Sequence, residues 1–187
     1  SGISEKAYSA FSPLFRKVPG GLLHTNIAVC TLFGAVSGSS LSTAAAVGSV
    51  AYPEMSKRGY DKSVVVGSLA GGGTLGLLIP PSLSFLIFGA LTETSIGRLF
   101  AAGIIPGIMV GSMFMIYILI KCIRNPDLAP RDKAPSSLFE IIIGFKQIWP
   151  LLTLIFLIIG SIMFGLATPT EAAGVGVILA VFISSIW

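Results

Sequence analysis

The stretch PGGLLHTNIAVCTLFGAVSGSSLSTAAAVGSVAYPEM, residues 19–55, decides the fold of this chain. Its apolar part at 22–53 has about 32 residues, whereas a helix that crosses a bilayer needs about 20. The apolar segment 22–53 is therefore too long for one crossing and too short for two crossings with a loop. Its middle, SGSS at 37–40, consists of small residues that favour turns and helix caps. The stretch predicts a re-entrant helical hairpin with a non-helical tip at 37–40.

The composition of the chain indicates a membrane protein. Its mean hydropathy is +0.91, and 11% of its residues are charged, less than half the share in a typical soluble domain. Its 12 Lys and Arg residues exceed its 8 Asp and Glu residues, but they lie between apolar runs and form no single basic stripe, so no nucleic-acid partner is expected. Because the chain starts without Met and stops within an apolar run, we expect a piece of a longer protein.

The positions of the basic residues favour the hairpin. Cations at 16–17 precede it and cations at 57–62 follow it, so both of its ends satisfy the positive-inside rule if they are cytoplasmic. The chain then crosses outward at 63–91 and returns at 99–120, before further basic residues. Arg98 is the one cation left outside, whereas reading 22–53 as a span places the basic groups on opposite sides.

The sequence divides into four parts. An amphipathic arm helix at 1–17 lies along the interface, and an apolar bundle follows at 18–124. A proline-rich loop and a second interfacial helix occupy 125–147, and apolar helices begin again at 148–187. Within the bundle, the predicted elements are the hairpin at 21–53, a broken helix at 63–91 and a helix at 99–120.

A second interruption lies within the apolar stretch at 63–91. Glycines at 71–73 and 76 are followed by IPPS at 79–82. Tandem prolines remove two backbone donors, so the helix must unwind there. Unwinding frees carbonyl oxygens that suit a hard cation such as Na⁺, and the helix after the hairpin tip offers its N-terminus to an anion. Two such interruptions predict the ion and substrate site of a secondary transporter.

The candidate site therefore combines the hairpin tip with the helix break. Its substrate- and ion-binding residues are Ser37, Gly38, Ser39, Ser40, Thr74, Gly76, Pro80, Pro81 and Ser82, with Na⁺ near Ser39, Thr74 and Gly76. Na⁺ acts as a coupling ion, and no cofactor is expected. A simpler alternative is that each interruption is a packing kink, since Gly and Pro are common in membrane helices. Glycines spaced by four at 67–76 and 103–111 are assigned to close helix contacts.

Two function classes other than a carrier use similar features. An intramembrane serine hydrolase needs a nucleophile and a base about 3 Å apart, but Ser37 and His24 lie about 20 Å apart along one helix. No carboxylate pair suits acid–base catalysis, so no enzyme is expected. The residues alone do not distinguish a carrier from a channel with a re-entrant pore loop. Cys30 and Cys122 are isolated small residues, which predicts neither a zinc site nor a disulfide.

Three strings together resemble the large membrane subunit of tripartite ATP-independent periplasmic (TRAP) transporters. They are the opening stretch at 19–55, GGGTLGLLIPPSLSFLIFGALTETSIGRLFAAGIIPG at 71–107 and FGLATPTEAAGVGV at 164–177. The resemblance covers essentially the whole chain, and the order and spacing of the SGSS, IPPS and TPTEAA motifs make it specific.

This resemblance implies an all-α, multi-pass protein of the bacterial inner membrane with an elevator-type transport mechanism. Residues 18–124 would be half of the transport domain, with a re-entrant hairpin and a discontinuous transmembrane helix, and 148–187 would begin the scaffold of a second repeat. The implied function is Na⁺-coupled uptake of an organic anion such as a C4-dicarboxylate, sialic acid or a similar sugar acid. The implied partners are a small membrane subunit, a periplasmic substrate-binding protein and membrane lipid.

Overall fold

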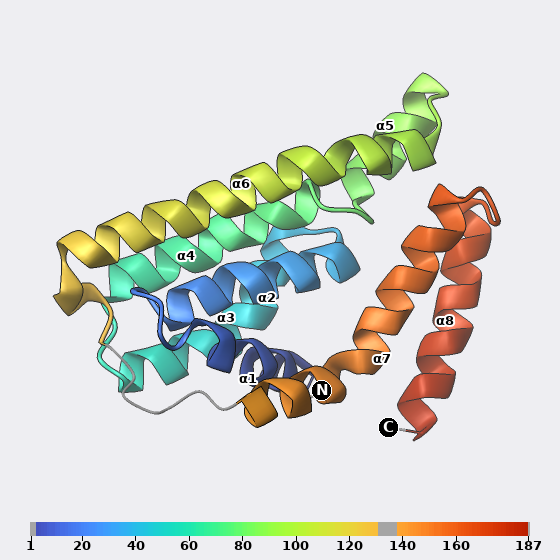
Figure 1. Ribbon diagram of the computed structural model, residues 1–187. Coiled ribbons are helices and arrows are strands. Elements are labelled where there is room, and N and C mark those ends of the chain that lie inside the picture. Colours follow the sequence, from blue (N-terminus) through green and yellow to red (C-terminus); the bar gives the residue numbers. More distant parts are fainter. Residues whose placement is uncertain (1–2, 131–137, 187) are drawn as a thin grey trace.

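The computed structural model describes residues 3–130 and 138–186, and every regular element in these ranges is a helix (Figure 1). The prediction of an all-α chain is therefore confirmed for the described residues. Two helices are long and apolar enough to cross a bilayer: α6 (Ile96–Arg124) and the part Phe139–Met163 of α7 (Leu138–Met163). In each, only 17% of the most apolar window is buried, so most of these apolar residues are not enclosed by the described part of the chain.

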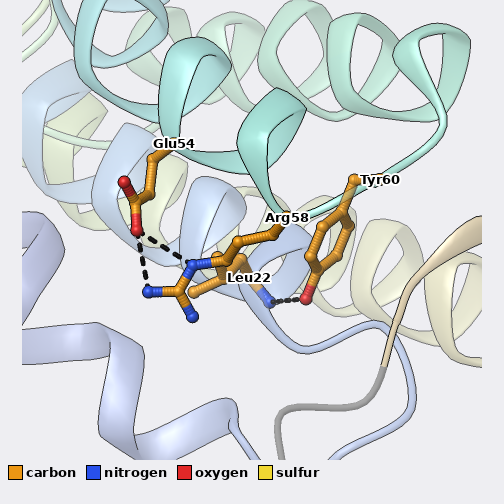
Figure 2. Close-up of polar contacts among 4 residues, drawn as sticks. All are labelled: Leu22, Glu54, Arg58 and Tyr60. Carbon is orange, nitrogen blue, oxygen red and sulfur yellow. Dashed lines mark hydrogen bonds and ion pairs between the residues drawn. The ribbon is translucent and has the colours of Figure 1, made fainter.

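Helices α2 (Leu22–Ser37) and α3 (Ser40–Lys57) run antiparallel and form the predicted hairpin (Figure 1). The end opposite the tip is fastened by Tyr60, whose hydroxyl accepts a hydrogen bond from the Leu22 N–H at 3.3 Å (Figure 2). The start of α2 and the segment after α3 therefore lie together.

The tip of the hairpin is shorter than predicted. Only Gly38 and Ser39 lie outside the helices, whereas Ser37 ends α2 and Ser40 begins α3. Gly38 has a φ of 59°, in the left-handed region that favours glycine, and its N–H donates to the Gly34 carbonyl. This closing bond allows α2 to continue to its last residue before the chain reverses.

The predicted break within 63–91 is present. Helix α4 (Lys62–Thr74) passes into the 3₁₀ turn η1 (Leu75–Leu77), and helix α5 (Leu83–Thr92) begins only after the non-helical segment 78–82. The tandem prolines lie in this segment, where their missing N–H groups leave no helical hydrogen bonds to continue. The discontinuous helix therefore ends for the reason that the sequence suggested.

The later helices extend beyond their predicted bounds. Helix α6 is longer at both ends than the predicted helix at 99–120. Helix α7 runs without interruption across 147–148, where an interfacial helix was separated from a membrane helix. It changes direction partway along its length (Figure 1) and contains Pro150. Residues 131–137, which include much of the predicted loop, lie outside the described residues.

The remaining elements complete the chain on either side of the hairpin and the broken helix. Helix α1 (Ile3–Phe15) is the predicted arm, the short turn η2 (Pro126–Leu128) follows α6, and α8 (Pro169–Ile186) ends the chain. Helices α7 and α8 run side by side as a separate pair (Figure 1). A small apolar cluster of Phe100, Ile162 and Ala172 joins this pair to α6.

The main core surrounds α2, which packs against α1, α3, α4 and α6. A helix buried on nearly all sides needs apolar residues around its whole circumference, and α2 has them. Its buried polar residues are His24, Thr25 and Asn26. The Asn26 Nδ2 donates to Ser68 Oγ at 2.8 Å on α4 and to Met55 Sδ at 3.3 Å on α3. Cys30 and Cys122 are free, buried thiols, and Cys30 packs against Gly72.

Candidate functional site

Hydroxyl groups hold the hairpin tip in place. The Ser37 and Thr43 hydroxyl oxygens lie 2.6 Å apart, and Ser37 Oγ also donates to the Ser39 carbonyl at 3.2 Å. Ser39 caps α3, because its Oγ accepts a hydrogen bond from the Ser42 N–H at 3.4 Å. Thr43 is completely buried, so the tip is anchored to the first turn of α3 by a side chain withdrawn from solvent.

Hydroxyl groups also donate hydrogen bonds to backbone carbonyls of the broken helix. Thr74 Oγ1 donates to the Gly71 carbonyl at 2.6 Å, at the end of α4. Ser82 is completely buried and donates to the Leu77 carbonyl at 2.7 Å, across the non-helical segment. Ser82 directly precedes α5, yet its side chain does not cap that helix. The first-turn N–H groups of α5 therefore receive no side-chain cap from the residue best placed to supply one.

The two interruptions touch through their backbones. A Cβ atom added at Gly76 would lie 2.8 Å from Gly34 Cα, too close for any side chain. One added at Gly73 would lie 2.9 Å from the Ser40 carbonyl oxygen, and one added at Gly38 would lie 3.1 Å from the Leu83 nitrogen. Glycines thus bring the hairpin and the broken helix into direct contact at three successive levels.

The structure places the predicted site residues unequally. Gly38, Ser40 and Gly76 lie at the contact between the two interruptions. Ser37 and Thr74 are exposed, with their hydroxyl groups bonded within their own segments. In the described part of the chain, no hydrogen bond joins a tip residue to a residue of the break. Backbone packing at glycines therefore holds the two interruptions together, while their hydroxyl groups form hydrogen bonds within their own segments.

Several backbone oxygen atoms in the segment between η1 and α5 lack N–H partners among the described residues. Leu78 and Ile79 both donate to the Leu75 carbonyl, at 3.0 and 2.9 Å. Among the described residues, no N–H group donates to the carbonyls of Leu78, Ile79 or Pro80. Carbonyl oxygens without N–H partners are the ligands that hard monovalent cations use at broken membrane helices. Pro80 itself is buried and Pro81 is half-buried, so the two rings fill the bend.

Three residues at this contact were not among the predicted site residues. Gly34 and Gly73 supply the close backbone approach, and Thr43 anchors the tip. Gly73 belongs to a glycine run that was recognised only as part of a break. Gly34 lies one helical turn before Gly38, and this spacing is the one sequence signal that it faces the same side as the tip.

The arrangement does not support hydrolysis. His24 Nε2 lies 2.9 Å from the Pro19 carbonyl oxygen, and its ring stacks on Phe15 with the centroids 5.8 Å apart. Ser37, the proposed nucleophile, is at the other end of α2 and shares its hydroxyl hydrogen bond with Thr43. His24 and Ser37 thus have different polar partners at opposite ends of α2.

Comparison with known proteins gives the family. The model of the family described as "Tripartite ATP-independent periplasmic transporter, DctM component" matches residues 1–187. The chain is 38% identical to the C4-dicarboxylate TRAP transporter large permease protein DctM of Pseudomonas aeruginosa, over 98% of this chain and 42% of that protein.

Two further relatives have other named substrates. The ectoine TRAP transporter large permease protein TeaC of Halomonas elongata is 41% identical over 89% of this chain and 38% of its own length. The sialic acid TRAP transporter permease protein SiaT of Haemophilus influenzae is 36% identical over 97% of this chain and 29% of its own length. The chain thus spans less than half the length of these relatives, all of which are transporter permeases. Because the family model covers every residue, this chain belongs to the DctM component family of tripartite ATP-independent periplasmic transporters, which are membrane proteins.

Proposed function

We propose that this chain supplies one half of the ion and substrate site of a secondary transporter that couples Na⁺ entry to uptake of an organic anion. The observation that carries the proposal is the backbone contact between Gly34 on the hairpin and Gly76 on the broken helix. A packing kink needs no second interruption beside it, whereas an ion site between two discontinuous helices needs both at one place. The contact therefore favours a site over two unrelated kinks.

Oxygen atoms near this contact suit Na⁺. The carbonyls of 78–80 have no N–H partner among the described residues. The Thr74 hydroxyl donates its hydrogen to the Gly71 carbonyl and keeps its lone pairs, and the Ser39 hydroxyl oxygen accepts from the Ser42 N–H and keeps a second lone pair. We assign Na⁺ to the region of Ser39, Thr74 and Gly76, with backbone oxygens as the principal ligands. Binding of Na⁺ here would stabilise the contact between the tip and the break and so favour the state that binds substrate.

The anion would be held by helix N-termini. Helix α3 begins at Ser40 and α5 at Leu83, and Gly38 brings the two starting points into contact. Each N-terminus carries partial positive charge and N–H donors that suit a carboxylate. The named substrates of two relatives, a C4-dicarboxylate and sialic acid, belong to this chemical class. We propose an organic carboxylate as the substrate of the complete permease.

The family name provides the setting for this function. A tripartite periplasmic system implies a small membrane subunit and a periplasmic substrate-binding protein as partners, and an inner-membrane location for the permease. In this setting, residues 18–124 act as half of a mobile transport domain and 148–187 belong to its scaffold. The complete permease, with a second set of such elements, carries out the elevator movement.

We expect Ser39→Leu in the complete permease to raise the Na⁺ concentration for half-maximal uptake about tenfold, the equivalent of about 1.4 kcal/mol of binding free energy. The substitution removes the oxygen that caps α3, between Gly38 and Ser40, which both contact the broken helix. Uptake is measured in proteoliposomes that contain both membrane subunits and receive substrate on the binding protein. Ser63→Leu, on an exposed position of α4, is the control. If Ser39→Leu is expressed normally and its Na⁺ requirement is unchanged, the tip is a packing kink and not part of the Na⁺ site.

The hairpin has a topological test of its own. Single cysteines introduced by Lys17→Cys and Lys57→Cys, in a background without Cys30 and Cys122, should react with an impermeant maleimide from the same, cytoplasmic side. The Leu22–Tyr60 hydrogen bond already holds the two ends of the hairpin together (Figure 2). The measurement compares labelling of intact cells with labelling of inside-out vesicles. Labelling from opposite faces would contradict both the re-entrant hairpin and the ion site that depends on it.

A further inference from the structure

A polar pocket lies between the arm helix α1 and the second helix of the hairpin, α3, far from the tip. Its volume is about 510 Å³, and its lining includes Tyr8 and Arg16 on the arm side and Glu54, Lys57 and Arg58 at the end of α3. None of these residues belongs to the ion and substrate site, and the proposed transport function assigns the pocket no role. The pocket therefore needs a separate explanation.

Positive charge predominates in this pocket. Three cations line it, against the carboxylates of Glu5 and Glu54. Arg58 forms an ion pair with Glu54, with Nη2 and Oε1 2.7 Å apart (Figure 2), which fixes the guanidinium at the wall. Arg16 Nη1 lies 3.0 Å from Glu140 Oε2 on α7. Lys57 forms no ion pair within the described residues and is the cation most available to a ligand.

Tyr8 adds a buried hydrogen-bond donor to this lining. Its side chain is 6% exposed, and its hydroxyl has no hydrogen-bond partner among the described residues. Burial raises the pKa of Tyr8, with a further rise from neighbouring Tyr60, so the hydroxyl keeps its proton and can only act as a neutral donor or acceptor. An unsatisfied buried hydroxyl costs free energy, which a bound oxygen atom would recover.

The other part of the lining is apolar. Leu22, Val50 and Pro53 contribute to the same pocket as the charged residues. A free phosphate ion has no apolar part that could contact this surface. A phospholipid has a glycerol and the first acyl carbons directly beside its phosphate. The pocket also lies at the end of the hairpin where basic residues flank the membrane, the level at which anionic headgroups gather.

We propose that this pocket binds the headgroup of an anionic phospholipid, with Lys57, Arg58, Arg16 and the Tyr8 hydroxyl directed to the phosphodiester and Val50 and Pro53 beside the glycerol. Such a lipid would lie where the arm meets the hairpin. The arm is itself tied to α7, because a Cβ added at Gly144 would lie 2.6 Å from Ala10 Cα and because Arg16 pairs with Glu140. A bound lipid would therefore connect the hairpin to the arm and, through it, to α7.

The test measures lipid binding to the complete permease in complex with its small membrane subunit. The complex is delipidated in detergent and titrated with dioleoyl phosphatidylglycerol, and bound lipid is counted by native mass spectrometry. Lys57→Gln should weaken binding at the strongest site about fivefold, the effect of one cation at a membrane surface. Lys62→Gln removes the same charge five residues later, outside the pocket lining, and should change binding less than twofold.

A second variant separates the pocket from general surface charge. Tyr8→Phe keeps the ring and the net charge and removes only the buried hydroxyl, so weaker phosphatidylglycerol binding in this variant supports a headgroup inside the pocket. Equal losses in Lys57→Gln and Lys62→Gln, together with normal binding in Tyr8→Phe, would overturn the proposal. So would equally tight binding of dioleoyl phosphatidylcholine, or displacement of the lipid by millimolar inorganic phosphate, which would identify a soluble-anion site.

Discussion

The variant Gly76→Ala should lose nearly all Na⁺-coupled uptake in the complete permease, a fall of about 10²-fold, the scale seen when a site is displaced by about 1 Å. The added Cβ would lie 2.8 Å from Gly34 Cα, and both partners in this contact are backbone atoms that no side-chain rotation can move aside. The broken helix must therefore shift away from the hairpin. The shift would move the break away from the hairpin tip, so uptake should fail even at saturating Na⁺.

The control for this variant is Gly67→Ala on the same helix, α4. A Cβ at Gly67 would meet no atom within 4 Å, so its uptake should remain close to that of the parent. Gly34→Ala approaches the same contact from the hairpin side and should reproduce the loss. Monodispersity in detergent and the apparent Tm show whether each variant is folded. Normal Na⁺-dependent uptake by folded Gly76→Ala would show that the contact is not part of the ion site.

Both interruptions were predictable from the sequence, because their causes are local. Tandem prolines end a helix wherever they occur, and a glycine beside serines ends one by favouring left-handed backbone and side-chain caps. The width of the tip was not predictable in the same way. Ser37 and Ser40 are helical because Ser37 bonds to Thr43 and Ser39 caps α3, and these pairings depend on the reversal of the chain.

The continuous helix α7 illustrates a second limit. The polarity of a sequence indicates which residues lie at the interface and which lie in the apolar phase, and it predicts a boundary between the interfacial helix within 125–147 and the apolar helices of 148–187. Backbone hydrogen bonds need not stop where polarity changes, and α7 continues through Pro150 to Met163. A proline within a helix removes one hydrogen bond and produces a bend without ending the helix when its neighbours compensate.

The candidate site was predictable in composition and less so in geometry. The spacing of four predicts close helix contacts. Gly103 and Gly107 do lie against Phe85 and Ile79, whereas the prediction is wrong for Gly67, where an added Cβ would meet no atom within 4 Å. Which glycine meets which backbone depends on how α2, α4 and α6 pack together, and no local pattern contains that information. The sequence thus indicates that two discontinuous helices exist, while the contact of Gly34 with Gly76 follows only from the fold.

Paired cysteines should reveal two positions of the transport domain relative to the scaffold. Gly97 begins α6 beside the end of α7, where a Cβ at Gly97 would lie 3.9 Å from Met163 Cα. The pair Gly97→Cys and Met163→Cys is therefore placed for a disulfide. A second pair, Gly97→Cys with Leu152→Cys, tests a register about three turns earlier on α7, a displacement of about 16 Å at 1.5 Å per residue.

An elevator carrier predicts that both disulfides form in the complete permease and that their ratio changes about tenfold when Na⁺ and substrate are added, a shift that requires about 1.4 kcal/mol of differential binding. An elevator mechanism requires the block at 18–124 to slide past 148–187 as one body, and the glycine contacts between the hairpin and the broken helix favour such a body because they resist deformation. Either disulfide, once formed, should stop uptake until it is reduced. A channel needs no such displacement, so a single register in every condition, or ion flux that persists with the blocks locked together, would favour the channel over the carrier.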